Sequence, residues 1–146
     1  MAGFLGQYEY QLDQKGRVSL PADYRRRVDD ARFVLLQWEP THLTLFPVEA
    51  WAGVQARMLE LRRSDPAMSR LLRHVTARAA EVEPDKQGRI LIPARLKEAA
   101  GLEGAVYLVG ALDRVEIWDP SRFDEATPPP GEGSGALEKA VHEIFG

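Results

Sequence analysis

The sequence has 146 residues, a net charge of −3, 45% hydrophobic residues and no cysteine. This size allows one compact domain or two closely joined small ones, and the lack of cysteine excludes disulfides and thiolate metal sites. No window reaches the roughly 18 apolar residues of a membrane helix, and the first residues lack the pattern of an export signal. We therefore expect a globular cytoplasmic protein.

The charges are distributed unevenly along the chain. Residues 1–97 contain 16 basic and 12 acidic residues, whereas residues 98–146 contain 3 basic and 10 acidic ones. The small net charge argues against a protein that coats nucleic acid indiscriminately. The excess of arginine over lysine fits either phosphate recognition or codon usage, and composition does not separate the two.

Two alternating segments come first, QYEYQL at 7–12 and RVSLP at 17–21. This pattern predicts two strands joined by a tight hairpin turn, in which Gly16 supplies positive φ. Because the apolar side chains of RVSLP share one face of its strand, Arg17 is expected on the face away from the core. Pro21 can then begin a short helix.

A second hairpin and a helical region follow. FVLLQW at 33–38 and LTLF at 43–46 are predicted to pair as strands. Residues 48–75 carry apolar side chains at spacings of three and four, which is typical of helices. Pro66 should divide this region into two helices, with Asp65 as the N-cap of the second.

The same pattern returns 72 residues later. The stretch DQKGRVSLP is followed at this offset by DKQGRILIP, and residues 13–51 fall on 85–123 without a gap. A constant offset indicates an internal duplication of one supersecondary unit. The second copy repeats the turn with Gly88, the short helix after Pro93, and a hairpin of VYLVGAL with VEIW.

The last part of the chain is a Pro/Gly-rich linker followed by a helix. TPPPGEGSG at 127–135 has the composition of a linker, and ALEKAVHEIF after it is an amphipathic helical segment.

No pattern of catalytic or metal-binding residues is present in the sequence. His42, His74 and His142 are isolated from one another and are expected to be surface or satisfied structural residues. The Pro/Gly segment lacks the Gly-Lys-Ser/Thr of a phosphate-binding loop, and no nucleophile elbow occurs. We therefore expect no enzyme, no metal and no cofactor.

The duplicated turn has two interpretations. In the first it is purely structural: Asp13 and Asp85 accept backbone N–H bonds, and Gly16 and Gly88 supply backbone freedom. This interpretation explains less well why each turn also carries cations on an outward face. In the second, two turns that present cations contact phosphates, since a two-stranded ribbon fits the major groove, about 12 Å wide. The residues alone support both equally.

The doubled motif resembles that of the MraZ family of bacterial transcriptional regulators. The similarity runs from FLGQYEYQLD through DxKGR and DxQGR to IWDPSRFD, nearly the whole chain. It implies an α+β fold in which two pseudo-repeated AbrB-like swapped-hairpin halves form a small β-barrel with flanking helices. The halves would be residues 1–75, including the connecting helices, and 76–126, followed by the linker and C-terminal helix at 127–146.

The resemblance also implies a function. Members bind short direct repeats in the promoter of the division and cell-wall gene cluster, including their own gene, and assemble into homo-oligomeric rings that work in the cytoplasm at the nucleoid. The DxxxR signature of the family falls on Asp13 to Arg17 and on Asp85 to Arg89. Arg17 is the expected leading contact. The full set of expected DNA contacts is Lys15, Arg17, Arg25, Lys86 and Arg89.

Two other classes of function stay open. An AbrB-like antitoxin or an oligomeric interaction scaffold would use the hairpins for dimerisation and the C-terminal tail for a partner. An enzyme is the weaker alternative because the catalytic pattern is missing.

Overall fold

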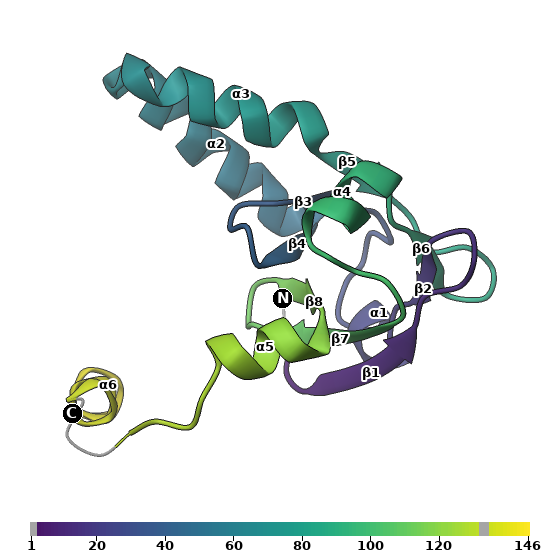
Figure 1. Cartoon of the computed structure of the whole chain (residues 1–146). Coiled ribbons are helices and arrows are strands. Elements are labelled where there is room, and N and C mark those ends of the chain that lie inside the picture. Colours follow the sequence, from purple (N-terminus) through teal and green to yellow (C-terminus); the bar gives the residue numbers. More distant parts are fainter. Residues whose placement is uncertain (1–2, 132–134) are drawn as a thin grey trace.

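The computed structural model describes residues 3–131 and 135–146 and shows an α+β fold (Figure 1). The first repeat contains β1 (Gln7–Gln11), β2 (Arg17–Ser19), α1 (Ala22–Arg25), β3 (Phe33–Leu36) and β4 (His42–Pro47). It is followed by α2 (Val48–Ser64), the 3-10 helix η1 (Pro66–Met68) and α3 (Ser69–Arg78). The second repeat contains β5 (Ala80–Val82), β6 (Arg89–Leu91), α4 (Ala94–Ala99), β7 (Ala105–Gly110) and β8 (Val115–Trp118). After these come α5 (Pro120–Ala126) and α6 (Ala136–Phe145).

The helical predictions are confirmed, with one extension. Pro66 separates α2 from η1 and α3, and the carboxylate of Asp65 accepts a hydrogen bond from the Ala67 N–H at 3.2 Å. The second helix continues to Arg78 rather than ending at residue 75. The C-terminal helix occupies the residues expected for it, whereas residues 132–134 of the expected linker lie outside the described ranges.

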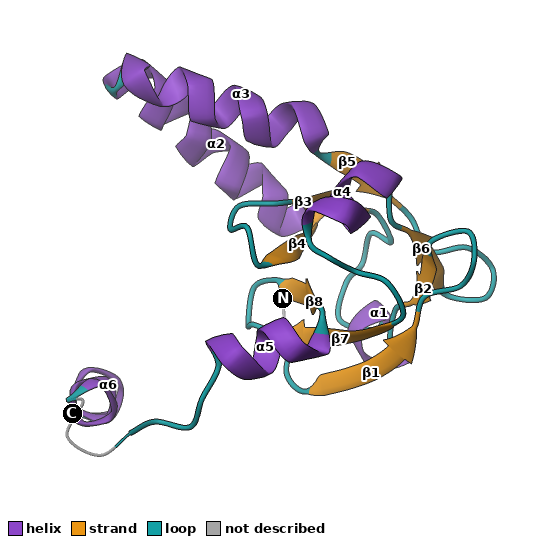
Figure 2. Ribbon diagram, viewed as in Figure 1, coloured by secondary structure: helices purple, strands orange, loops and turns teal. Residues whose placement is uncertain are grey.

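The strands exchange partners between the two repeats (Figure 2). One antiparallel sheet has the order β1-β7-β8-β4-β3-β5, and β2 and β6 form a separate two-stranded ribbon. The predicted hairpins β3–β4 and β7–β8 are confirmed. The predicted pairing of the segments at 7–12 and 17–21 is wrong, because β1 pairs with β7 and β2 pairs with β6.

The ladders also leave the sheet open, so the small closed β-barrel is not formed by the described strands. The edge strands β1 and β5 do not pair with each other, and the three-residue strands β2 and β6 pair only with one another. Since the chain passes directly from each edge strand into a turn and then into the ribbon, the ribbon packs over the sheet instead of bridging its edges.

The registers reveal an internal two-fold axis. In the ribbon Val18 lies opposite Ile90, and in the sheet Thr44 of β4 lies opposite Glu116 of β8. In both pairs the partners are 72 residues apart, so each residue faces its own counterpart in the other repeat. Such self-paired positions mark where a pseudo-two-fold axis passes, through the ribbon and through the middle of the sheet.

The central core lies between the sheet, the ribbon and the short helices. Val18 and Ile90 of the ribbon are buried there, together with Tyr24 of α1 and Leu96 of α4. The outward face of the ribbon carries the side chains between these apolar positions, and Arg17 is only half-buried, as its alternation with Val18 predicts.

A second, smaller core explains why β3 is apolar throughout and why β4 is buried along its whole length. Phe33 and Leu35 of β3 face the central core, while Val34 and Leu36 face α2 and α3. A strand buried on both faces reads as a continuous apolar run, whereas β7 alternates between buried and half-buried residues. Figure 1 shows α2 and α3 projecting together from this side of the sheet.

The remaining two helices are α5 and α6. Phe123 of α5 packs edge-on against Trp118 and Tyr107, with ring centroids 5.4 and 5.6 Å away. Figure 1 shows α6 apart from the rest of the molecule, at the end of an extended segment. No helix within the described ranges is long and apolar enough to cross a membrane.

Candidate nucleic-acid interface

Each DxxxR turn is organised by its aspartate in the same way. The Asp13 Oδ1 atom accepts hydrogen bonds from the backbone N–H groups of Lys15 (2.9 Å) and Arg17 (2.8 Å). In the second repeat Asp85 Oδ1 accepts them from Gln87 (2.9 Å) and Arg89 (3.0 Å). The aspartates therefore fold the turns, as the structural interpretation of the motif requires.

These hydrogen bonds also keep both carboxylates ionised. The Arg17 backbone N–H, helped by the Arg17 side chain and the Lys15 N–H, lowers the pKa of Asp13 to about 2. The pKa of Asp85 is lowered as well, chiefly by the backbone N–H of Arg89. At neutral pH each turn thus contains a fixed negative charge that can hold a cation in place.

The two arginines of the motif are held by these carboxylates. Arg17 Nε lies 2.7 Å from Asp13 Oδ2, and Arg89 Nη2 lies 3.2 Å from Asp85 Oδ2. Arg89 Nη1 also lies 3.7 Å from Asp13 Oδ2, which links the two repeats. A guanidinium has five N–H donors, and these contacts use only part of them. Both side chains stay about 30% exposed, at 30% and 28%, so each is oriented by the protein and still open to solvent.

Each turn is tied through the backbone of its glycine to the end of the other repeat's ribbon strand. The Gly16 carbonyl accepts a hydrogen bond from Ile92 N (2.9 Å), and the Gly88 carbonyl accepts one from Leu20 N (2.8 Å). Gly16 has φ 83° and Gly88 has φ 77°, the left-handed region that glycine adopts at little cost. The ribbon and its two turns therefore form one unit, and each turn depends on the other repeat.

Arg25 of α1 lies against the turn of the second repeat. Its Nε donates to the Leu20 carbonyl at 3.1 Å, and a Cβ atom placed on Gly88 would be only 2.8 Å from the Arg25 Cζ. The side chain is exposed on its other side. Arg25, expected as a flanking DNA contact, thus borders the duplicated turns and also supports one of them.

Replacing Gly88 with alanine should reduce the free energy of unfolding by about 1–2 kcal/mol through the positive φ, and further by displacing Arg25. Gly16→Ala has the same cost from its positive φ, but it displaces no arginine. The nearest atom to a Cβ placed on Gly16 is the Ile92 carbonyl oxygen, at 3.2 Å. In urea unfolding, an Arg25→Ala background should relieve part of the Gly88→Ala cost and none of the Gly16→Ala cost. Strict additivity of Gly88→Ala and Arg25→Ala would contradict the contact.

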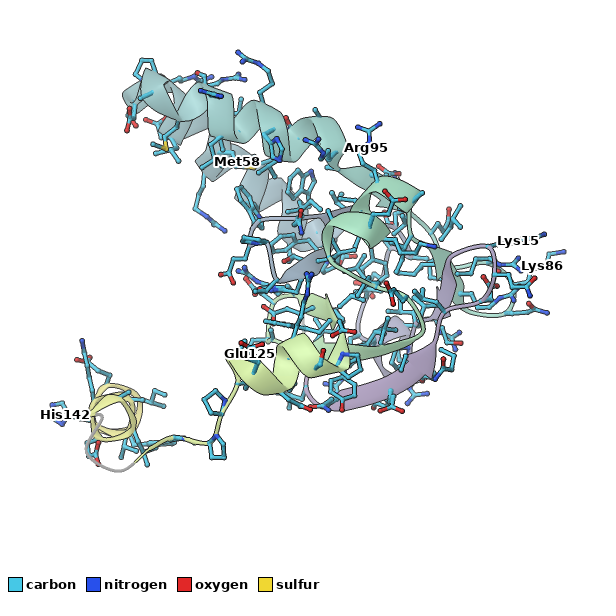
Figure 3. The ribbon with its side chains drawn as sticks, in the orientation of Figure 1. Lys15, Met58, Lys86, Arg95, Glu125 and His142 are labelled. Atoms are coloured by element: carbon cyan, nitrogen blue, oxygen red, sulfur yellow. The ribbon has the colours of Figure 1, made fainter. Side chains whose placement is uncertain are left out.

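The lysines occupy the tips of the turns. Lys15 and Lys86 are exposed, and Figure 3 shows both pointing away from the body on the side of the molecule that carries the ribbon. Aligned at the offset of 72, Lys15 falls on Gln87 and Lys86 on Gln14, so the two turns carry their lysine at neighbouring positions of the same motif. The structure thus brings all the sequence-predicted contact residues to one end of the molecule.

Two contacts of this site were not predicted from the sequence. The link from Arg89 to Asp13 and the contact of Arg25 with the Gly88 turn both cross from one repeat to the other. The constant offset shows that the unit is duplicated, but no periodicity shows that the copies exchange strands. The short lengths of RVS and RIL could have suggested this exchange, because strands of three residues are too short to form stable hairpins alone.

The histidines do not form a second site. His42 is buried, stacks on Trp118 at 4.1 Å and shares a 2.8 Å hydrogen bond with Thr41, so it is a satisfied structural residue. His74 contacts Arg78 on the surface of α3. Across residues 3–131 and 135–146, no three His, Asp or Glu side chains gather in a way that could hold a metal ion.

Comparison with known proteins adds family evidence to this geometry. A family model described as "MraZ protein, putative antitoxin-like" matches residues 4–74 and again residues 75–127. A protein of Acetivibrio thermocellus named "Transcriptional regulator MraZ" is 40% identical over 121 residues, which cover 83% of this chain and 84% of the relative. A protein of the same name from Thermoanaerobacter pseudethanolicus has the same identity and coverage. Another, from Chromobacterium violaceum, is 38% identical over 119 residues and 80% of each chain.

Proposed function

Because the chain belongs to the MraZ family, we propose that it is a sequence-specific DNA-binding transcriptional regulator. The family is not one of enzymes, and the similar proteins carry the name of transcriptional regulators. The proposed target is a set of short direct repeats in the promoter of the division and cell-wall gene cluster, including the gene of the protein itself. The protein would act in the cytoplasm, associated with the nucleoid.

One observation carries this proposal: two turns of the same geometry flank one ribbon, with cations at their tips. The β2–β6 ladder and the contact of Arg89 with Asp13 hold the turns together. Lys15 and Lys86 project from this unit into solvent. A two-stranded ribbon of this kind fits the major groove of B-DNA, about 12 Å wide, where side chains reach base edges and phosphates.

The side chains of the ribbon and its two turns would have different roles in binding DNA. Arg17 is the proposed leading contact, because Asp13 fixes its Nε and leaves its other N–H donors for a base edge or a phosphate. Lys15 and Lys86 would contact phosphates as point charges, and Arg89 would support them. Arg25 would contact the backbone beside the turns. The turn residues Asp13, Gly16, Asp85 and Gly88 would act by holding the cations in place.

The exchange of strands between repeats supports an AbrB-like swapped-hairpin relationship within one chain. We propose residues 1–75 and 76–126 as the two halves and 127–146 as an appended linker and helix. A single subunit offers few cations, so we further propose that subunits assemble into a ring whose members engage successive repeats. Linkage of several weak contacts multiplies their effect without a strongly basic surface.

A gel-shift experiment tests the function. DNA from upstream of the gene should be retarded by the purified protein, binding should fall as each direct repeat is scrambled, and the affinity should fall steeply with salt. Arg17→Ala should weaken promoter binding. The residue assignment is wrong if this variant assembles normally and keeps both the affinity and the salt slope. Absence of retardation, together with capture of a dedicated protein partner, would instead favour an antitoxin or scaffold.

A further inference from the structure

Helices α2 and α3 enclose an apolar groove that faces solvent. It has a volume of about 480 Å³, and Met58 lies within it (Figure 3). Trp51 and Leu59 of α2 and Leu72 of α3 line it with apolar surface, and Leu59 is 36% exposed. A continuous apolar surface of this kind is typical of a place where another chain segment binds.

Helix α6 has an apolar face that nothing in the described chain is seen to cover. Its exposed side chains are Leu137, Val141, Ile144 and Phe145, and Phe145 is 81% exposed. Their spacing of four, seven and eight residues from the first places them on one face of the helix. Peptide helices that bind in grooves use anchors at this spacing.

We propose that α6 of one copy of this chain docks into the α2–α3 groove of a second copy. The dimensions agree, since the ten residues of α6 span about 15 Å and the stretch of α2 from Trp51 to Arg62 spans about 16 Å. Pro128 to Pro130 follow α5 after Thr127, and consecutive prolines form a stiff, extended segment. Figure 1 shows α6 beyond this segment and away from its own body, which leaves its apolar face open to a second copy.

The charges of the two surfaces are complementary. The groove is lined by Arg62 and Arg73, and the segment from 48 to 78 has a net charge of +3. On α6, Glu138 borders the same surface as Val141 and Phe145, and the helix as a whole has a net charge of −1. Opposite charges beside an apolar contact select the partner and fix its register. This inference goes beyond DNA binding, because it assigns the surface through which copies of the chain join.

Cysteine crosslinking tests the inference directly, because the chain has no cysteine of its own. One full-length protein carries Gln55→Cys in the groove and another carries Val141→Cys on α6; both positions are exposed, so both variants should fold. After mixing and mild oxidation without DNA, we expect a covalent dimer whose linkage between positions 55 and 141 is identified by peptide mass spectrometry. A disulfide requires the Cα atoms to approach within about 7 Å.

The matched control places the cysteine on the opposite face of α6, as Lys139→Cys. Its linkage to Gln55→Cys should be about tenfold lower. In a second test, Glu138→Arg added to the Val141→Cys protein should reduce the linkage, and Arg73→Glu added to the Gln55→Cys protein should restore it. Equal linkage from both faces would overturn the inference. So would a chain carrying Gln55→Cys and Val141→Cys that links only to itself. Since no DNA is present, loss of promoter binding leaves this result unaffected.

Discussion

Asp13→Ala is expected to weaken binding to the repeat DNA by about tenfold or more, although it removes a negative charge from the surface that would face phosphates. The Asp13 carboxylate accepts hydrogen bonds from the N–H groups of Lys15 and Arg17, fixes the Arg17 side chain and contacts Arg89 of the other repeat. Without it, the first turn loses its internal support and Arg17 loses its orientation. Ordering these groups again on DNA costs binding free energy.

The matched variant is Asp85→Ala, which makes the same change of charge. The Asp85 carboxylate holds only its own turn and Arg89, so its loss should weaken binding less than the loss of Asp13. Fluorescence anisotropy on labelled repeat DNA measures both affinities. If the long-range charge dominated, both variants would bind more tightly than the wild type, and the geometric account of the turns would fail.

Removing both tip lysines, as Lys15→Ala with Lys86→Ala, should cause the second large loss of affinity. Each lysine would neutralise one phosphate, so the slope of log K against log salt should decrease by about 0.9 per lysine for every bound subunit. In a ring that engages several repeats this loss recurs in each subunit. Since both side chains are exposed, the free energy of unfolding should hardly change.

A charge-matched control lies at the far end of the molecule. Arg63 near the end of α2 is 75% exposed and Arg70 near the start of α3 is also exposed, so Arg63→Ala with Arg70→Ala removes two positive charges without touching the ribbon. Its affinity and salt slope should stay close to those of the wild type. A similar loss in this control would mean that net charge, rather than the position of Lys15 and Lys86, determines binding.

Much of the local structure could be predicted because it depends on local chemistry. The glycines at positive φ, the break at Pro66 and the Asp65 cap each follow from the properties of one or two residues. The duplication was visible as a constant offset. Helix α5 could also have been predicted from local chemistry, since Asp119 caps it and Pro120 occupies its first turn.

The partners of the strands could not be predicted, because alternation fixes which face a side chain occupies and not which strand lies beside it. When two repeats share one pattern, pairing within a repeat and pairing between repeats bury the same side chains. Val18 is buried in either arrangement, but only the exchanged one places it opposite Ile90. The contact of Arg89 with Asp13 follows from that exchange, so it could not be predicted from the sequence either.

The internal two-fold axis has a consequence for direction along DNA. A protein with true two-fold symmetry matches palindromic sites, because both of its halves present identical surfaces. Here the halves differ where they would meet DNA: Gln14 and Lys15 are replaced by Lys86 and Gln87, and Ser19 by Leu91. The unit therefore has polarity, so that turning it around on the duplex presents different side chains to the same bases. Subunits that all face one way along the duplex suit tandem sites, and inverted sites would place half of them in the wrong orientation.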